Sequence, residues 1–123
     1  MEDSILKTTK KILGIDAAYT AFDLDIITHI NMVFTTLHDL GVGPPEGFFI
    51  ESDEANWVDF ELDPLQRNAV KTYVFLRVKL AFDPPQTPFH ILSLEKQVQE
   101  LEWRLNVRRE NVAWIPPSSP SLP

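Results

Sequence analysis

The clearest helical pattern lies between residues 23 and 40. Either Thr20 or Asp23 can open a helix there, and Gly41 supplies a stop signal at its end. Apolar side chains recur at intervals of three and four residues and predict one wide buried face, made of Ile26, Ile27, Ile30, Val33, Phe34, Leu37 and Leu40.

A shorter helical pattern precedes it. Asp3 or Ser4 can cap this helix, and Gly14 can end it in a left-handed conformation. Its apolar positions are Ile5, Leu6, Ile12 and Leu13. We interpret its lysines as a solvated basic face, formed by Lys7, Lys10 and Lys11.

Residues 41–63 change character and carry glycines, a Pro-Pro pair and many acids. The segments "FFIES" and "WVDFE" predict two short strands of a hairpin, with "DEAN" near its turn. Six carboxylates could suggest a cation site, but the ligand order and glycine of an EF-hand loop are missing. We therefore favour a solvated acidic loop, with the carboxylates of Glu51, Asp53, Glu54, Asp59, Glu61 and Asp63.

A third helix is predicted to start at Asp63 or Pro64 and to run through "PLQRNAVKTYVFLRVKLAF". One of its faces consists of Leu65, Ala69, Tyr73, Leu76 and Leu80, and further apolar residues spread round the rest: Val70, Val74, Phe75, Val78 and Phe82. A helix that is apolar over most of its circumference has to be covered on more than one side. Another subunit is a candidate for this cover, which makes Val74, Phe75 and Val78 candidate interface residues.

The segment "FDPPQTPF" predicts a corner between two helices. Pro84 and Pro85 must end the third helix, because a proline in a helix interior removes a donor and clashes with the preceding turn. Pro88 follows a possible N-cap, Thr87, and suits the first position of a new helix.

The fourth predicted helix extends from Pro88 to about Glu110. Its heptad-like seam is expected to pack on the preceding helices and consists of Ile91, Leu94, Val98, Leu101 and Leu105. Trp103 points away from this seam, and Val107 lies one turn further on the same side. A second apolar stripe opposite a core seam favours a partner, so Trp103 and Val107 are candidate interface residues.

The last residues, "NVAWIPPSSPSLP", predict an extended tail whose large apolar anchors are Trp114 and Ile115. A docking peptide and a disordered terminus remain equal interpretations of it. The pattern predicts a mainly α domain of about four helices at residues 1–110, with a short hairpin or loop between the second and third helices. The tail occupies residues 111–123.

The composition is that of a globular protein, with 44% hydrophobic and 24% charged residues. A formal net charge of -7 argues against a nucleic-acid-binding surface. The absence of cysteine excludes disulfides and thiolate chemistry. The start lacks a signal peptide, and no window approaches the roughly 20 apolar residues of a membrane span. We expect a soluble protein made in a cytoplasm, with no membrane partner.

No motif of catalysis or cofactor binding occurs in the sequence. It has no nucleophile elbow, no phosphate-binding glycine loop and no dinucleotide fingerprint. His29 and His38 are nine positions apart, which does not match a two-histidine metal site on a helix. We therefore expect neither an enzyme nor a cofactor.

The order of segments resembles the small head-tail connector proteins of long-tailed phages, also called head completion or adaptor proteins. The resemblance covers nearly all of residues 1–110. It rests on "FDPP" followed by a proline-capped helix, on "ELEWRLN", and on the order of these segments: "SILKTTKKILGI", "YTAFDLDIITHINMVFTTLHDLGVGP", "GFFIESDEANWVDF", "NAVKTYVFLRVKLAFDPPQTPF" and "LEKQVQELEWRLNVRRE".

This resemblance implies a structural virion protein at the neck, synthesised in the host bacterial cytoplasm. Its partners would be other copies of itself in a ring, dodecameric in the virion, the portal protein, and a tail-side stopper or tail completion protein. Genomic DNA would pass through the channel without sequence-specific binding, and an acidic wall suits that passage. Members of such families often dock terminal segments on neighbours, so Trp114 and Ile115 are candidate docking residues.

Two other classes stay open at this point. A homodimeric binding or regulatory module could use the heptad-like helix, although a DNA-binding regulator would be expected to carry a basic surface. A metal-dependent enzyme could use the acidic loop and is the more distant alternative.

Overall fold

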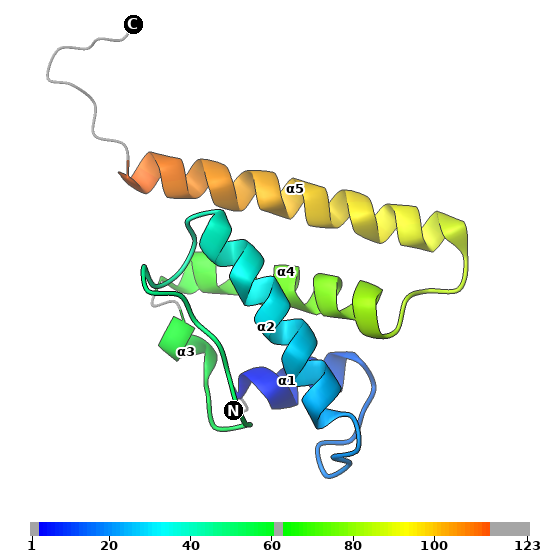
Figure 1. The fold of residues 1–123 in the computed structure, drawn as a ribbon. Coiled ribbons are helices and arrows are strands. Elements are labelled where there is room, and N and C mark those ends of the chain that lie inside the picture. Colours follow the sequence, from blue (N-terminus) through cyan, green and yellow to red (C-terminus); the bar gives the residue numbers. More distant parts are fainter. Residues whose placement is uncertain (1–2, 61–62, 114–123) are drawn as a thin grey trace, which may run out of the picture.

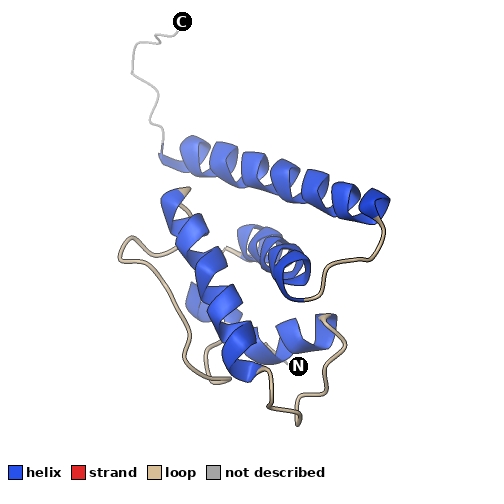
Figure 2. Ribbon diagram, turned by 45° about the vertical axis from the view of Figure 1, so that its right-hand side comes forward, coloured by secondary structure: helices blue, strands red, loops and turns tan. Residues whose placement is uncertain are grey.

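The computed structural model describes residues 3–60 and 63–113 of the 123-residue chain, with side chains as far as Asn106. This part contains five helices: α1 (Ile5–Ile12), α2 (Asp23–Asp39), α3 (Trp57–Phe60), α4 (Pro64–Phe82) and α5 (Pro88–Ala113) (Figure 1). Loops make up the rest of the described chain, without a strand (Figure 2). The mainly α fold class is confirmed, with one helix more than the pattern predicted.

Helix α4 lies at the centre of the fold and contacts all four other helices. Four of its side chains are completely buried: Val70, Tyr73, Val74 and Val78. The prediction that this helix needs cover on several sides is therefore confirmed. The expectation that another subunit supplies the cover is wrong, because α1, α2, α3 and α5 of the same chain supply it.

Helix α5 packs along α4 and runs in the opposite direction (Figure 1). Its predicted seam faces inward: Val98 and Leu105 are buried, whereas Ile91, Leu94 and Leu101 are partly buried. The intramolecular packing of the seam is confirmed. The helix continues to Ala113, three residues beyond its predicted end.

A polar cluster also joins α4 to α5. The Tyr73 hydroxyl donates a 2.6 Å hydrogen bond to Glu102 Oε2 and accepts a 2.7 Å bond from Arg77 Nη1. Burial, together with the bond to Glu102, raises the pKa of Tyr73 far above its ordinary value. The phenol therefore stays protonated and keeps donating to the carboxylate. The otherwise apolar α4–α5 contact gains a fixed register from this cluster.

The N-terminal helix forms as predicted. Ser4 is the N-cap of α1, and its Oγ accepts a bond from the Lys7 amide. Gly14 follows the helix with a φ of 80°, a value that suits glycine. For α2, the end at Leu40 and Gly41 is confirmed, but its start at Phe22 has no side-chain cap.

The predicted hairpin is wrong for the described residues. "WVDF" forms the one-turn helix α3 instead of a strand. Asp59 Oδ2 accepts a 2.9 Å bond from the Asn56 amide, and the three-residue spacing of Trp57 and Phe60 buries both rings on one side of this turn. Residues 61–62, which complete the expected strand, lie outside the described part.

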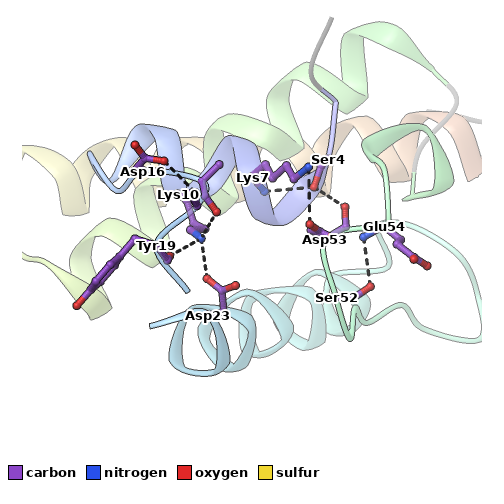
Figure 3. A network of polar contacts seen from close by, with 11 residues as sticks. Ser4, Lys7, Lys10, Asp16, Tyr19, Asp23, Ser52, Asp53 and Glu54 are labelled. Carbon is purple, nitrogen blue, oxygen red and sulfur yellow. Dashed lines mark hydrogen bonds and ion pairs between the residues drawn. The ribbon is translucent and has the colours of Figure 1, made fainter. Parts of the chain in front are cut away.

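The extended residues before α3 pair with the N-terminus instead of with each other. Ser4 and Asn56 form an isolated antiparallel bridge, with a 3.0 Å bond from the Ile5 amide to Ala55 O. Ser4 Oγ donates to Asp53 O over 2.8 Å (Figure 3). The acidic loop is thus closed onto the start of α1.

One side chain of α2 fixes the middle of the same loop. Asn31 Nδ2 donates to Ile50 O over 2.9 Å, and Asn31 Oδ1 accepts from the Ile50 amide over 2.8 Å. The side-chain amide of Asn31 takes the place of a paired strand residue. It satisfies the backbone N–H and C=O of Ile50, whose side chain is buried. The backbone partner that a hairpin would have provided is therefore replaced by a side chain.

The proline corner is built as predicted. Helix α4 ends at Phe82, before Pro84 and Pro85, and α5 begins at Pro88. Thr87 Oγ1 accepts a 3.3 Å bond from the His90 amide, so it acts as the N-cap of α5. Phe82 packs edge-to-face on Phe22, with ring centroids 5.5 Å apart. The corner is thereby attached to the start of α2.

The polar cluster of Tyr73, Arg77 and Glu102 predicts a pH-dependent loss of stability in Tyr73→Phe. Removing a donor to a carboxylate should lower the free energy of unfolding by about 1.5–3 kcal/mol. Because the folded state raises the pKa of Tyr73, this contribution is complete below about pH 10 and fades as the pH rises further. Chemical denaturation of both proteins at neutral pH and above pH 10 measures the difference.

The matched control is Tyr19→Phe, because the Tyr19 ring is half exposed. We expect no comparable loss in that variant. Equal losses of stability in the two variants, or a loss in Tyr73→Phe that persists undiminished at high pH, would contradict the role given to the polar cluster.

Candidate interaction surface

The outer face of α5 carries three large apolar side chains that nothing in the described chain covers. Phe89 is 76% exposed, Leu92 is 58% exposed and Trp103 is 67% exposed. At 3.6 residues per turn these positions fall within about 60° of one another, opposite the buried Leu105. We call Phe89, Leu92 and Trp103 the α5 stripe. Large exposed apolar side chains on one face mark an interaction surface.

The structure separates the other predicted interface residues. Val74 and Val78 are completely buried in the core of the chain, so their assignment to a subunit interface is corrected. Phe75 is partly buried and packs edge-to-face on Trp57, with ring centroids 5.8 Å apart. Val107 belongs to α5, but its side chain lies outside the described part, as do both docking candidates, Trp114 and Ile115.

A second exposed apolar region lies at the opposite end of the molecule, in the loop of residues 14–22 and the two helix ends beside it. Tyr19 is 51% exposed, and the side chains of Ile12, Phe22 and Leu24 are also open to solvent. We call Ile12, Tyr19, Phe22 and Leu24 the loop patch. Sequence reasoning missed it, although three large apolar residues outside the predicted helical faces were a usable signal: Tyr19, Phe22 and Leu24.

The Lys10 ammonium holds this loop in place, as Figure 3 shows. Its Nζ donates to Ala17 O over 3.0 Å and to Tyr19 O over 2.7 Å, and it lies 2.8 Å from Asp23 Oδ1. Asp23 Oδ1 is buried without a hydrogen bond of good geometry among the described groups, so attraction between opposite charges compensates its burial. The loop closes around a cation supplied by the helix before it.

The predicted solvated lysine face is therefore wrong for Lys10, whose exposed fraction is 1%. Lys11 is exposed, and Lys7 lies half exposed beside Asp53, 3.7 Å from its Oδ2. Acceptors on the chain seven and nine residues further on decide the burial of Lys10, and helical periodicity does not encode them.

The described residues contain no group of three or more His, Cys, Asp or Glu side chains placed to hold a metal ion. His38 Nε2 lies 3.0 Å from Pro45 O, and His29 packs against the Phe82 ring, which agrees with the surface or hydrogen-bonding roles predicted for both. Within the described chain, no helix is both long and apolar enough to cross a bilayer.

Comparison with known families gives the identification. A family model described as "Phage connector protein" matches residues 5–112, from the first residue of α1 almost to the end of α5. The chain belongs to the phage connector protein family. This confirms the predicted family, whose members have a structural role and not a catalytic one. No curated protein and no solved structure gives a significant match.

The α5 stripe predicts a sharp contrast between two neighbouring positions. Trp103→Ala should leave the melting temperature of the subunit almost unchanged, because the ring is mostly exposed. Leu105→Ala, on the inner side of the same helix, should lower the free energy of unfolding by about 2–5 kcal/mol, because it leaves a cavity in the core. Thermal unfolding of the two variants provides the measurement. A drop for Trp103→Ala as large as that for Leu105→Ala would place the indole inside the core.

Proposed function

We propose that this protein is a head-tail connector, or adaptor, of a phage virion. Its copies form a ring beneath the portal, extend the channel for DNA and offer a platform to a tail-side stopper or tail completion protein. The family match over residues 5–112 carries the proposal. The neck of the virion is its place of action, after synthesis in the bacterial cytoplasm.

Two features of the molecule support a ring. Apolar side chains are exposed on the α5 stripe and on the loop patch, which lie on different elements. A contact between two different surfaces of identical subunits can repeat by rotation and close into a ring. A subunit with one such surface would instead favour a two-fold dimer.

The net charge of -7 agrees with a channel through which DNA moves. Lysine and arginine side chains on a channel wall would bind phosphates and retain the DNA. An acidic wall avoids this binding, so DNA passes without sequence-specific contacts. No cofactor enters the proposed function.

The alternative of a homodimeric regulator loses its support. It depended on the seam of α5 as a dimer contact, and that seam packs against α4 of the same chain. The exposed face of α5 lacks the continuous apolar seam of a coiled coil, because Lys96 and Gln99 occupy the heptad positions between Leu92 and Trp103.

Assembly with the portal tests the proposed function. We expect light scattering to detect rings of the protein, alone or after mixing with the portal of the same phage. Serum albumin in place of the portal controls for non-specific association. A protein that stays monomeric both alone and in the presence of the portal would refute the adaptor role.

The corner predicts a defect in assembly that is separate from folding. Pro84 is exposed and Pro85 is partly exposed, so replacing both with alanine leaves the core intact. The chain between α4 and α5 would then be free to become helical, which would alter the relative placement of the two helices. We expect nearly unchanged thermal unfolding and reduced joining of heads to tails. Normal head-tail joining by the double variant would show that the corner does not set the geometry of assembly.

A further inference from the structure

Charge is divided along the chain in a way that the net value hides. Residues 12–66 contain eleven Asp and Glu and no Lys or Arg. Residues 67–110 contain eight Lys and Arg and five Asp and Glu. The first segment comprises the loop patch, α2 and α3, and the second comprises α4 and α5. Each subunit therefore has a strongly acidic part and a mildly basic part.

The two apolar surfaces lie on opposite sides of the molecule. Helix α5 covers one side of α4, whereas α1 packs on α2 and α4 from the other side (Figure 1). The α5 stripe faces away from α4, and the loop patch adjoins the end of α1 and the start of α2. Because the two surfaces lie on opposite sides, they cannot contact each other within one copy.

The loop patch has a fixed shape before any partner binds. Lys10 holds the carbonyl groups of Ala17 and Tyr19, and the Tyr19 ring packs edge-to-face on Phe22, with centroids 5.7 Å apart. Phe22 in turn packs on Phe82 of α4. A surface loop ordered in this way loses little conformational entropy on binding. Exposed aromatic rings on such a loop are typical anchors of an interface.

Local charges match between the two surfaces. Two exposed carboxylates, Asp16 and Asp25, lie beside the loop patch, together with one exposed cation, Lys11. On the outer face of α5, Lys96 lies between Leu92 and Trp103, while the nearby Glu100 is already paired with Arg104 over 2.7 Å. The loop patch thus has a surplus of carboxylates beside its apolar side chains, and the α5 stripe has an ammonium group at its middle.

We propose that the loop patch of one copy docks on the α5 stripe of the next copy. This inference rests on the proposed ring and names the two surfaces that form its repeated contact. Charge favours this pairing over the contact of two loop patches, because carboxylates on both sides would repel each other, whereas Lys96 offers them a cation. The contact is head-to-tail, which is the kind that closes by rotation.

Introduced cysteines test this contact cleanly, because the natural chain has none. Ala18→Cys is exposed beside Tyr19, and Gln99→Cys is exposed between Leu92 and Trp103, so both variants keep the apolar residues. Light scattering first establishes that each variant still assembles, alone or with portal. The assemblies are then oxidised and examined on non-reducing gels.

An equal mixture of the two single variants should give a disulfide-linked dimer at about a quarter of the contacts, if copies mix at random round a ring. Neither variant should give this dimer by itself. A chain carrying both cysteines should give a ladder of linked oligomers, because every contact then holds one pair. Glu46→Cys, exposed at a different place in the acidic part, replaces Ala18→Cys in the control mixture and should give no dimer.

Each other result has a definite meaning. Linkage of Gln99→Cys to itself would show that α5 stripes meet symmetrically, and it would overturn the inference. Assembly without linkage in the mixture would also overturn it and would leave the proposed function intact, with another partner on these surfaces. Failure of every variant and of the natural chain to assemble would refute the inference and the proposed function together.

Discussion

The fold depends on the burial of α4. A helix with apolar residues round most of its circumference is stable in water only when it is surrounded. Complete burial of Val70, Val74 and Val78 shows how far this requirement is met by one short chain. The other helices pack against α4, and the faces that they turn outward carry polar side chains together with some large apolar ones. The surfaces available for assembly are then those that remain after α4 has been covered.

Periodicity in the sequence was sufficient to predict α1, α2, α4 and α5 and the inward seam of α5. In these elements apolar residues recur every three or four positions, so the signal for each helix lies within its own sequence. The proline corner was equally predictable, because Pro84, Pro85 and Pro88 act through steric effects on neighbouring residues. Among the interface candidates, the outward direction of Trp103 followed from helix geometry, whereas the burial of Val74 and Val78 depended on which element covers them.

Two of the features that sequence reasoning missed involve partners beyond the reach of the local helical repeat. Asn31 replaces a strand by binding the backbone of Ile50, and Lys10 finds acceptors in a loop without secondary structure. Both interactions satisfy polar groups with side chains whose type alone suggests an exposed position. A prediction from local pattern assigns such residues to solvent and the loops they hold to strands or to disorder. The family match gives the function class, yet these side-chain bonds to the backbone determine the shape of the loops on which that function would depend.

The Lys10 anchor has a consequence for how related sequences can vary. One side chain of fixed length reaches both Ala17 O and Tyr19 O. The length of the Lys10 side chain therefore constrains the number of residues between position 10 and position 19. An insertion in this loop would move at least one carbonyl group out of reach and leave an ammonium group enclosed without its acceptors. Surface loops ordinarily tolerate changes of length better than helices do. This one should instead conserve its length as a helix does, while its exposed side chains remain free to change with the partner.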